Sequence, residues 1–233
     1  MPREKMNVEK VYIIIPIYNE ESVIGEVLSG VRQAGYRNII VVDDGSWDRS
    51  YAAANSIPEV IVLRHKLNRG KGAAIKTGVL AAQYCGAEVL VTIDGDGQHD
   101  PYDIEKLIEP IMKNGFDVVL GTRMRGGTEM PLIKVLANKI GNYCTMLLYG
   151  MLVSDSQSGF RAYSRFAART IDTKADKYEY DSKVIREINA NRLKYVEVPI
   201  TVRYTQYSMT KKHRQGFVNG LRTLVRMVWD KIL

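Results

Sequence analysis

Short runs of apolar residues alternate with stretches of helical spacing along the first half of the chain. The runs show no polar alternation, which is typical of strands buried on both faces of a parallel sheet. Strands are expected at 11–15, 39–42, 60–63, 87–93 and 116–120. Between them, apolar residues recur at helical spacing, as in 23–31, and predict helices that cover the sheet. The pattern therefore indicates an α/β fold with a mainly parallel sheet flanked by helices.

The second half of the chain has longer helical stretches. The expected elements are a helix with one apolar stripe at 135–152, a short strand at 160–163, a helix at 178–189 and a strand at 193–198. The last stretch, 213–233, predicts an amphipathic helix with basic residues just before it. Because no repeat, low-complexity tract or linker divides the sequence, residues 1–233 are expected to form a single domain.

Polar residues follow the expected strands of the first half. They are Tyr18 and Glu20, Asp43 and Asp44, Arg69 and Lys71, Asp94 and Asp96, and Arg123 and Arg125. In open parallel sheets, ligands bind beyond the carboxyl ends of the strands. We therefore expect these side chains to gather at one site.

The stretch 94–101 holds the strongest candidate for chemistry. Carboxylates at positions i and i+2 of an extended backbone point the same way, so Asp94 and Asp96 can hold one hard divalent cation. Gly95 and Gly97 would let a phosphate or sugar approach the backbone closely. The alternative is an acidic turn without a ligand, because Asp-Gly pairs form turns readily. The other polar strand ends favour the cation site.

Composition narrows the kind of partner. The formal charge of +7, from 33 basic and 26 acidic residues, favours anionic partners: phosphorylated substrates, nucleic acid or an anionic membrane surface. The two cysteines, Cys85 and Cys144, exclude a disulfide framework. No signal peptide and no stretch of about 20 apolar residues is present, so we expect a cytoplasmic protein without a spanning segment. No recognised nucleic-acid-binding module is present, and no Gly-x-Gly-x-x-Gly fingerprint follows the first strand, which argues against nucleic acid and against a nicotinamide dinucleotide as partners.

Seven motifs follow one another along the chain: 15–20, 42–46, 68–74, 94–101, 121–123, 155–161 and the late residues Arg203, Ser208 and Lys211. Together they resemble the family 2 glycosyltransferases of GT-A fold, and within them the dolichyl-phosphate mannose or glucose synthase group. The resemblance covers nearly the whole chain. It implies a GT-A fold whose residues 1–122 bind a nucleotide sugar and whose residues 123–233 bind the acceptor.

The resemblance also implies a role for individual residues. Those expected to cradle the base and ribose are Pro16, Tyr18, Glu20, Val42 and Asp44. Those expected to bind Mg²⁺ or Mn²⁺ and the diphosphate are Asp94, Asp96 and Gln98, with Gly95 in the same turn. Those expected to face the acceptor phosphate and the donor diphosphate are Arg123, Lys139, Arg203 and Lys211. Asp96, Arg123 and Arg203 are the expected catalytic residues.

The implied reaction moves a hexose, with mannose favoured, from a nucleoside diphosphate to a polyprenyl or dolichyl phosphate with inversion. GDP-mannose is the favoured donor and UDP-glucose the other candidate. A phosphate acceptor is already an oxyanion, so no general base is required. One alternative is transfer to a saccharide hydroxyl, with Glu179 or Asp181 as the base. Another is a nucleotide-sugar-binding module without catalysis.

A lipid acceptor would place the protein on the cytosolic face of a membrane. The helices at about 132–152 and 213–233 are the candidates for lying in the interface, because amphipathic helices with basic neighbours can do so. Packing on the sheet is the commoner fate of such helices. We expect that fate for 135–152, while both remain open for 213–233.

Overall fold

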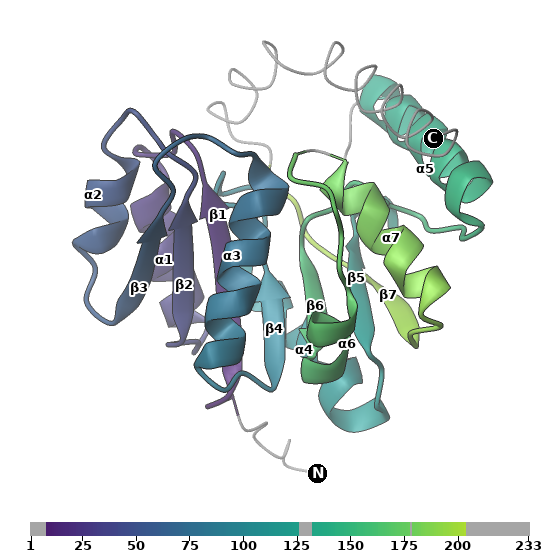
Figure 1. Ribbon diagram of the computed structural model, residues 1–233, viewed down its shortest axis with the longest axis horizontal. Helices are drawn as coiled ribbons and strands as arrows, with labels where there is room; N and C mark the ends of the chain where they lie inside the picture. The colour runs from purple at the N-terminus through teal and green to yellow at the C-terminus, as the bar shows by residue number, and fades with distance from the viewer. Residues whose placement is uncertain (1–7, 126–131, 178, 204–233) are drawn as a thin grey trace.

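The computed structural model describes residues 8–125, 132–177 and 179–203, and within these ranges it shows a seven-stranded sheet between two layers of helices (Figure 1). The strands are β1 (Val11–Ile17), β2 (Ile39–Asp43), β3 (Val60–Arg64), β4 (Val89–Thr92), β5 (Val118–Thr122), β6 (Arg161–Ser164) and β7 (Tyr195–Pro199). Their order in the sheet is β3-β2-β1-β4-β6-β5-β7. The expected mainly parallel α/β sheet is confirmed, since only β6 runs antiparallel to its neighbours, β4 and β5.

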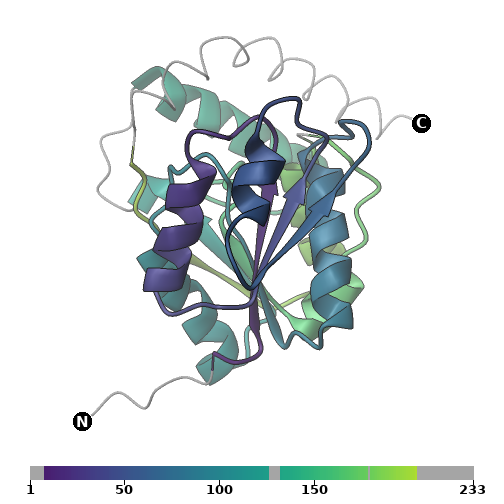
Figure 2. The same ribbon diagram turned by 90° about the vertical axis from the view of Figure 1, so that its left-hand side faces the viewer.

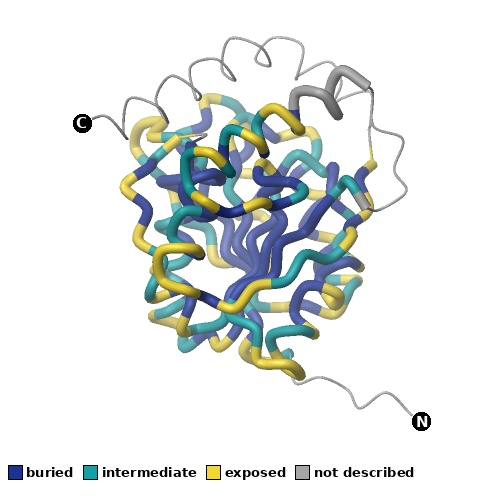
Figure 3. Tube along the Cα trace, turned by 90° about the vertical axis from the view of Figure 1, so that its right-hand side faces the viewer, coloured by how far each residue is buried: buried dark blue, intermediate teal, exposed yellow. Residues whose placement is uncertain are grey.

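Two hydrophobic clusters hold the helices to the sheet. On one face lie α1 (Ile24–Gln33), α2 (Ser50–Asn55) and α4 (Ile104–Asn114); on the other lie α3 (Lys71–Tyr84), α6 (Arg165–Thr170) and α7 (Tyr180–Ala190). Figure 2 shows both layers edge-on, and Figure 3 shows the strands as the buried centre between them. Burial on both faces explains why the strands read as continuous apolar runs.

The antiparallel strand β6 decides which loops meet. Because β6 runs against β4 and β5, its amino end lies at the same edge as the carboxyl ends of the parallel strands. We call this edge the carboxyl edge. The loop before β6, residues 154–160, therefore joins the loops that follow β1, β2, β4, β5 and β7.

Local capping signals in the sequence set two of the helix starts. Asp100 accepts a hydrogen bond from the Tyr102 backbone N–H at 3.1 Å, and Pro101 begins a 3₁₀ turn, η1 (Pro101–Asp103), that leads into α4. The short helix α6 is absent from the sequence-based expectation. Its signal is Ser164, whose hydroxyl caps the Ala167 N–H at 3.1 Å.

Helix α5 (Leu132–Tyr149) lies at the carboxyl edge (Figure 1). Its burial pattern is the reverse of that of an ordinary amphipathic helix, because polar residues are buried and apolar residues are exposed. Over residues 138–149, where burial is described, the buried residues are polar: Asn138, Asn142 and Thr145. The apolar residues Ile140, Tyr143 and Leu147 are 54%, 58% and 59% exposed. We call these three residues the α5 outer face. The expectation that this stripe packs on the sheet is wrong for them, because the helix turns its polar side toward the 154–158 loop.

Within the described residues, no helix is long and apolar enough to cross a membrane. The expected C-terminal helix at 213–233 and the expected anion-binding residue Lys211 lie outside the described residues. Both stay predictions.

Candidate active site

Asp94, at the end of β4, is part of an ionic network at the carboxyl edge. Its Oδ1 lies 2.7 Å from the Lys71 ammonium, and its Oδ2 lies 3.5 Å from His99 Nε2. Lys71 also reaches Asp181 Oδ2, at 3.2 Å. The sheet order explains this meeting: Lys71 starts α3, Asp94 follows β4, and Asp181 lies in the first turn of α7 on the same face as α3.

The charges of this network stabilise one another. Burial of the Asp94 carboxyl acts to raise its pKa, but Lys71 and His99 outweigh burial and hold the pKa well below its usual range. Burial likewise acts to lower the pKa of Lys71, but Asp181 and Asp94 outweigh it and raise the pKa. Both groups are therefore charged at neutral pH.

The turn 95–98 holds a second carboxylate, that of Asp96, two residues after Asp94. Asp96 accepts a hydrogen bond from the Gln98 backbone N–H at 3.1 Å and another from the Gln98 side-chain amide. Gly97 has φ +71°, in the left-handed region that glycine adopts without strain. Gly95 has a different reason: a Cβ there would lie 2.6 Å from Cγ2 of Ile17 in β1. Packing against β1 thus requires this glycine whether or not a ligand binds.

Asp44 organises the turn that leads into α3. Its carboxylate accepts hydrogen bonds from the backbone N–H groups of Arg69, at 3.0 Å, and Gly70, at 2.6 Å, and His65 Nδ1 lies 2.8 Å from it. Asp43 is fully buried, accepts from the Ser46 N–H at 3.0 Å and so braces its own turn. The predicted contact of Asp44 with a ribose stays a prediction.

The remaining residues expected to bind the nucleotide differ in exposure. Tyr18 is 38% exposed beyond β1, whereas Glu20 is nearly buried and its backbone N–H donates to Ser50 Oγ at 2.6 Å. Pro16 lies within β1, and Val42 is fully buried in the cluster beneath α3. The structure thus gives Val42 a packing role, and nucleotide contacts by these residues stay predictions.

Arg123, after β5, forms a bidentate pair with Asp155. Its Nε and Nη2 lie 2.6 Å and 2.7 Å from the two carboxylate oxygens, and its backbone N–H donates to the same group at 3.1 Å. Asn138 of α5 donates to Asp155 at 2.9 Å. The Asp155 side chain is fully buried. This cluster joins α5, the loop before β6 and β5 at the carboxyl edge.

The other residues expected to handle anions lie more openly. Arg203 pairs with Asp100 Oδ2 at 2.8 Å while its side chain is 61% exposed, and its backbone N–H donates to the Gln98 carbonyl at 2.7 Å. The Gln98 bond places the chain after β7 beside the acidic turn. Lys139 is exposed on α5. The anion-binding roles of Arg123, Lys139 and Arg203 stay predictions.

Asp181, one of the two candidate bases, lies between two cations. One oxygen faces Lys71, and the other lies 3.8 Å from the guanidinium of Arg161, which is itself buried in β6. Arg161 also donates to the Ser158 and Ser156 carbonyls, both at 2.8 Å. Glu179, the other candidate, is nearly buried just before α7.

The donor set fits a divalent cation that takes few ligands from the protein. Within the described residues no group of three or more His, Cys, Asp and Glu side chains forms a protein-only metal cage. Asp94 and Asp96 offer two carboxylates on one turn, and Mg²⁺ commonly takes one or two carboxylates and completes its shell with water and phosphate oxygens. The Lys71 ammonium lies 2.7 Å from Asp94, so positive charge is favoured at this position.

The arrangement defines a GT-A glycosyltransferase fold. Glucosyl-3-phosphoglycerate synthase from Mycobacterium tuberculosis, solved with Mn²⁺, uridine diphosphate and phosphoglyceric acid, matches with a TM-score of 0.67 at 19% identity, covering 92% of this chain and 78% of that one. Mannosyl-3-phosphoglycerate synthase from Rubrobacter xylanophilus matches with a TM-score of 0.67 at 15% identity, covering 94% and 72%.

Sequence comparison gives the family. Residues 12–172 match the profile described as glycosyl transferase family 2, and the chain belongs to this family of glycosyltransferases. It is 41% identical to an uncharacterized protein of Methanocaldococcus jannaschii, over 98% of this chain and 95% of the relative. It is 39% identical to UDP-N-acetylglucosamine–dolichyl-phosphate N-acetylglucosaminyltransferase of Methanococcus voltae, over 86% and 88%. It is 32% identical to polyprenol monophosphomannose synthase of Mycolicibacterium smegmatis, over 87% and 81%.

Sequence reasoning missed the partners of the site residues. Asp155 and Arg161 lay in a matched motif without an assigned role, and Lys71 was one polar residue among several. A signal for Lys71 was its position at the start of a helix, where the helix dipole disfavours a cation. No local pattern pointed to Asp155 as the partner of Arg123.

Proposed function

We propose that the protein transfers a sugar from a nucleoside-diphosphate sugar to a polyprenyl phosphate, with inversion at the anomeric carbon. The relatives from Methanococcus voltae and Mycolicibacterium smegmatis, whose names give dolichyl-phosphate and polyprenol-phosphate products or acceptors, support this class of acceptor. Direct displacement by the acceptor oxyanion accounts for inversion without a covalent enzyme intermediate.

The choice of a phosphate acceptor rests on the ion pairing of Asp181. A hydroxyl acceptor needs a base with a free oxygen to take its proton. Both oxygens of Asp181 instead face cations, Lys71 at 3.2 Å and Arg161 at 3.8 Å. Asp181 is also buried, so it presents no free oxygen to an incoming hydroxyl. A phosphate acceptor requires no such base.

We propose that Asp94, Asp96 and Gln98 hold a divalent cation, Mg²⁺ or Mn²⁺. When bound, such an ion offsets the negative charge of the departing nucleoside diphosphate. The structurally similar synthase from Mycobacterium tuberculosis was solved with Mn²⁺, which supports a divalent ion at this type of fold. Arg123 and Arg203 add positive charge at the same edge and would orient the donor and acceptor phosphates.

Two donors remain the leading candidates. The resemblance to dolichyl-phosphate mannose synthases favours GDP-mannose, whereas the 39% identical relative uses UDP-N-acetylglucosamine according to its name. Both are diphosphates with the same requirement for charge compensation, so the proposed site suits either. The proposal therefore specifies the reaction and the acceptor class, and the donor assay identifies the sugar.

The decisive experiment tests donor and acceptor together. GDP-mannose, UDP-N-acetylglucosamine and UDP-glucose are each incubated with the protein and a polyprenyl phosphate, with and without EDTA. We expect a glycosylated lipid phosphate with one donor, and loss of product with EDTA that excess Mg²⁺ or Mn²⁺ restores. The matched control is the unphosphorylated polyprenol, for which no product is expected. Transfer to the polyprenol, or to a saccharide hydroxyl alone, would contradict the proposal.

A lipid acceptor also gives the α5 outer face a function. We propose that Ile140, Tyr143 and Leu147 rest in the interface of the membrane that holds the acceptor, on its cytosolic face. The three residues are more than half exposed and lie at helical spacing, at the carboxyl edge where the acceptor must arrive. Exposed apolar side chains on one helix face are otherwise a solubility cost.

Replacing the α5 outer face by glutamine (Ile140→Gln, Tyr143→Gln, Leu147→Gln) is expected to reduce binding to anionic lipid vesicles by about tenfold or more, because the inserted apolar area is lost. Vesicle co-sedimentation measures this, and circular dichroism checks the fold. The control replaces Leu67, Leu80 and Tyr84, which are also exposed but lie on and before α3. Equal binding by the two triple variants would refute the interfacial role of α5.

A further inference from the structure

Lys71 forms the centre of the ionic network without having an assigned role in donor binding. Its ammonium contacts Asp94 Oδ1 at 2.7 Å and Asp181 Oδ2 at 3.2 Å, so two of its three N–H donors point at carboxylates. Its side chain is 21% exposed and that of Asp94 is 27% exposed. Both side chains are therefore partly accessible from outside the protein.

Helix stability does not explain a lysine at this position. Lys71 is the first residue of α3, where the helix dipole disfavours a cation, and the first turn holds no acidic residue to compensate. The loop before β6 also packs closely against Lys71 and Asp94. A Cβ on Gly159 would contact the Lys71 ammonium and lie 2.7 Å from Asp94 Oδ1, so the loop before β6 passes directly over these two groups.

We propose that Lys71 is a positioning residue that acts as a built-in counter-cation: it holds Asp94 and Asp181 together and competes with the divalent cation for Asp94. This inference rests on the proposed cation site. Without an ion, two carboxylates near one another would repel, and the ammonium prevents this. When an ion binds at Asp94, the ammonium has Asp181 as its second partner, so its charge stays compensated.

The geometry predicts that removing the charge of Lys71 and removing the charge of Asp181 change the affinity for a divalent ion in opposite directions. Removing the ammonium leaves Asp94 without its competing partner and adds net negative charge, so a divalent ion should bind more tightly. Removing the charge of Asp181 leaves Asp94 as the only partner of Lys71, so the same ion should bind more weakly. A residue that merely supported the fold would weaken ion binding at both ends.

The test measures Mn²⁺ binding directly, by electron paramagnetic resonance of the free ion, in the full chain without any donor or acceptor. Lys71→Met is expected to lower the Kd for Mn²⁺ about tenfold, the effect of removing one neighbouring charge. Lys71→Arg keeps the charge and should stay within about twofold of the wild type. Asp181→Asn should raise the Kd. In the double variant Lys71→Met with Asp181→Asn, the Asp181 effect should shrink, because no ammonium remains to be redirected.

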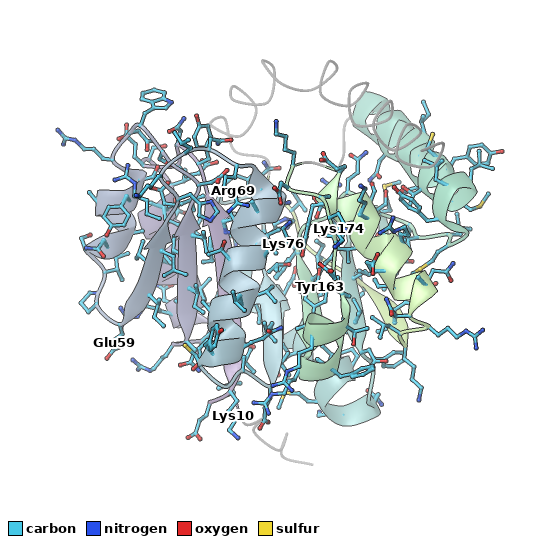
Figure 4. All side chains as sticks on the ribbon, viewed as in Figure 1. Lys10, Glu59, Arg69, Lys76, Tyr163 and Lys174 are labelled. Carbon is cyan, nitrogen blue, oxygen red and sulfur yellow. The ribbon has the colours of Figure 1, made fainter. Side chains whose placement is uncertain are left out.

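Lys76→Met is the matched control, because Lys76 lies further along α3 (Figure 4) and pairs with Asp176 rather than with Asp94. It should leave the Kd for Mn²⁺ unchanged. Unchanged or weaker binding in Lys71→Met would overturn the inference. If Lys71→Met does not fold, the inference fails when Asp181→Asn binds Mn²⁺ as tightly as the wild type. Wild-type binding that Asp96→Asn does not alter would overturn the cation site itself and this inference with it.

Discussion

Replacing Asp96 with asparagine is expected to lower sugar transfer by about two to three orders of magnitude while the protein stays folded. The reason is charge. Asparagine has nearly the shape of aspartate and its side-chain oxygen can still accept from the Gln98 backbone N–H, so the turn is retained. It cannot supply the negative charge that a cation needs beside the diphosphate. The measurement is the rate of product formation with the donor identified by the assay.

The control for this variant is Asp172→Asn, which removes a carboxylate of an exposed pair with Lys174 that takes no part in the ionic network. Its rate should equal that of the wild type. A rate for Asp96→Asn within about threefold of the wild type, at saturating Mg²⁺ or Mn²⁺, would contradict the role proposed for Asp96.

Replacing Asp155 with asparagine is expected to destabilise the protein by about 3 kcal/mol, because removing one partner of a buried ion pair leaves the other charge uncompensated. Asparagine keeps only one acceptor oxygen, so Arg123 would lose one of its two side-chain bonds and the charge that opposes it, and Asn138 would face an altered acceptor. Denaturant unfolding measures the change as a lower midpoint at an unchanged slope. Asp172→Asn again serves as the control and should change stability by less than about 0.5 kcal/mol, as expected for an exposed pair.

The destabilisation caused by Asp155→Asn should become smaller as the pH falls. Burial acts to raise the pKa of Asp155, but the hydrogen bonds and charge of Arg123 outweigh it and hold the pKa below its ordinary value. A depressed pKa adds stability above the unfolded-state pKa of about 3.9 and loses it as the pH falls toward the folded-state pKa. The difference between wild type and Asp155→Asn should therefore narrow between about pH 5 and pH 3. A difference that stays constant over this range would show that the carboxylate charge is not what stabilises the cluster.

The ionic network also limits what activity alone can reveal about Asp181. An Asp181→Asn variant that loses activity would look like the loss of a general base. The same loss follows if the ammonium of Lys71 is redirected to Asp94, because ion binding then weakens. The Mn²⁺ measurement separates these causes, since only the second changes the affinity for the ion in the absence of substrates.

The sequence by itself determined the α/β class, most strand positions, the acidic turn at 94–98 and the family. These follow from local physics: buried parallel strands read as continuous apolar runs, and turns and helix starts need particular residues. The expected strand boundaries differ from the observed ones where an apolar run continues beyond the hydrogen-bonded part of the strand. The run 87–93, for example, forms the strand Val89–Thr92. The helix α6 escaped notice because its signal is a single serine cap.

Only the tertiary structure decided how the charged residues pair and which side of α5 faces outward. Lys71 and Asp181 are 110 residues apart, and no periodic pattern links them; they meet because α3 and α7 lie on the same face of the sheet. Arg123 meets Asp155 because β6 is inserted antiparallel between β4 and β5 and brings its preceding loop to the carboxyl edge. That same loop offers polar groups to Asn138 and Asn142, so α5 buries its polar side. An apolar stripe in a sequence predicts a helix face, but the surface it meets depends on contacts that only the folded chain creates.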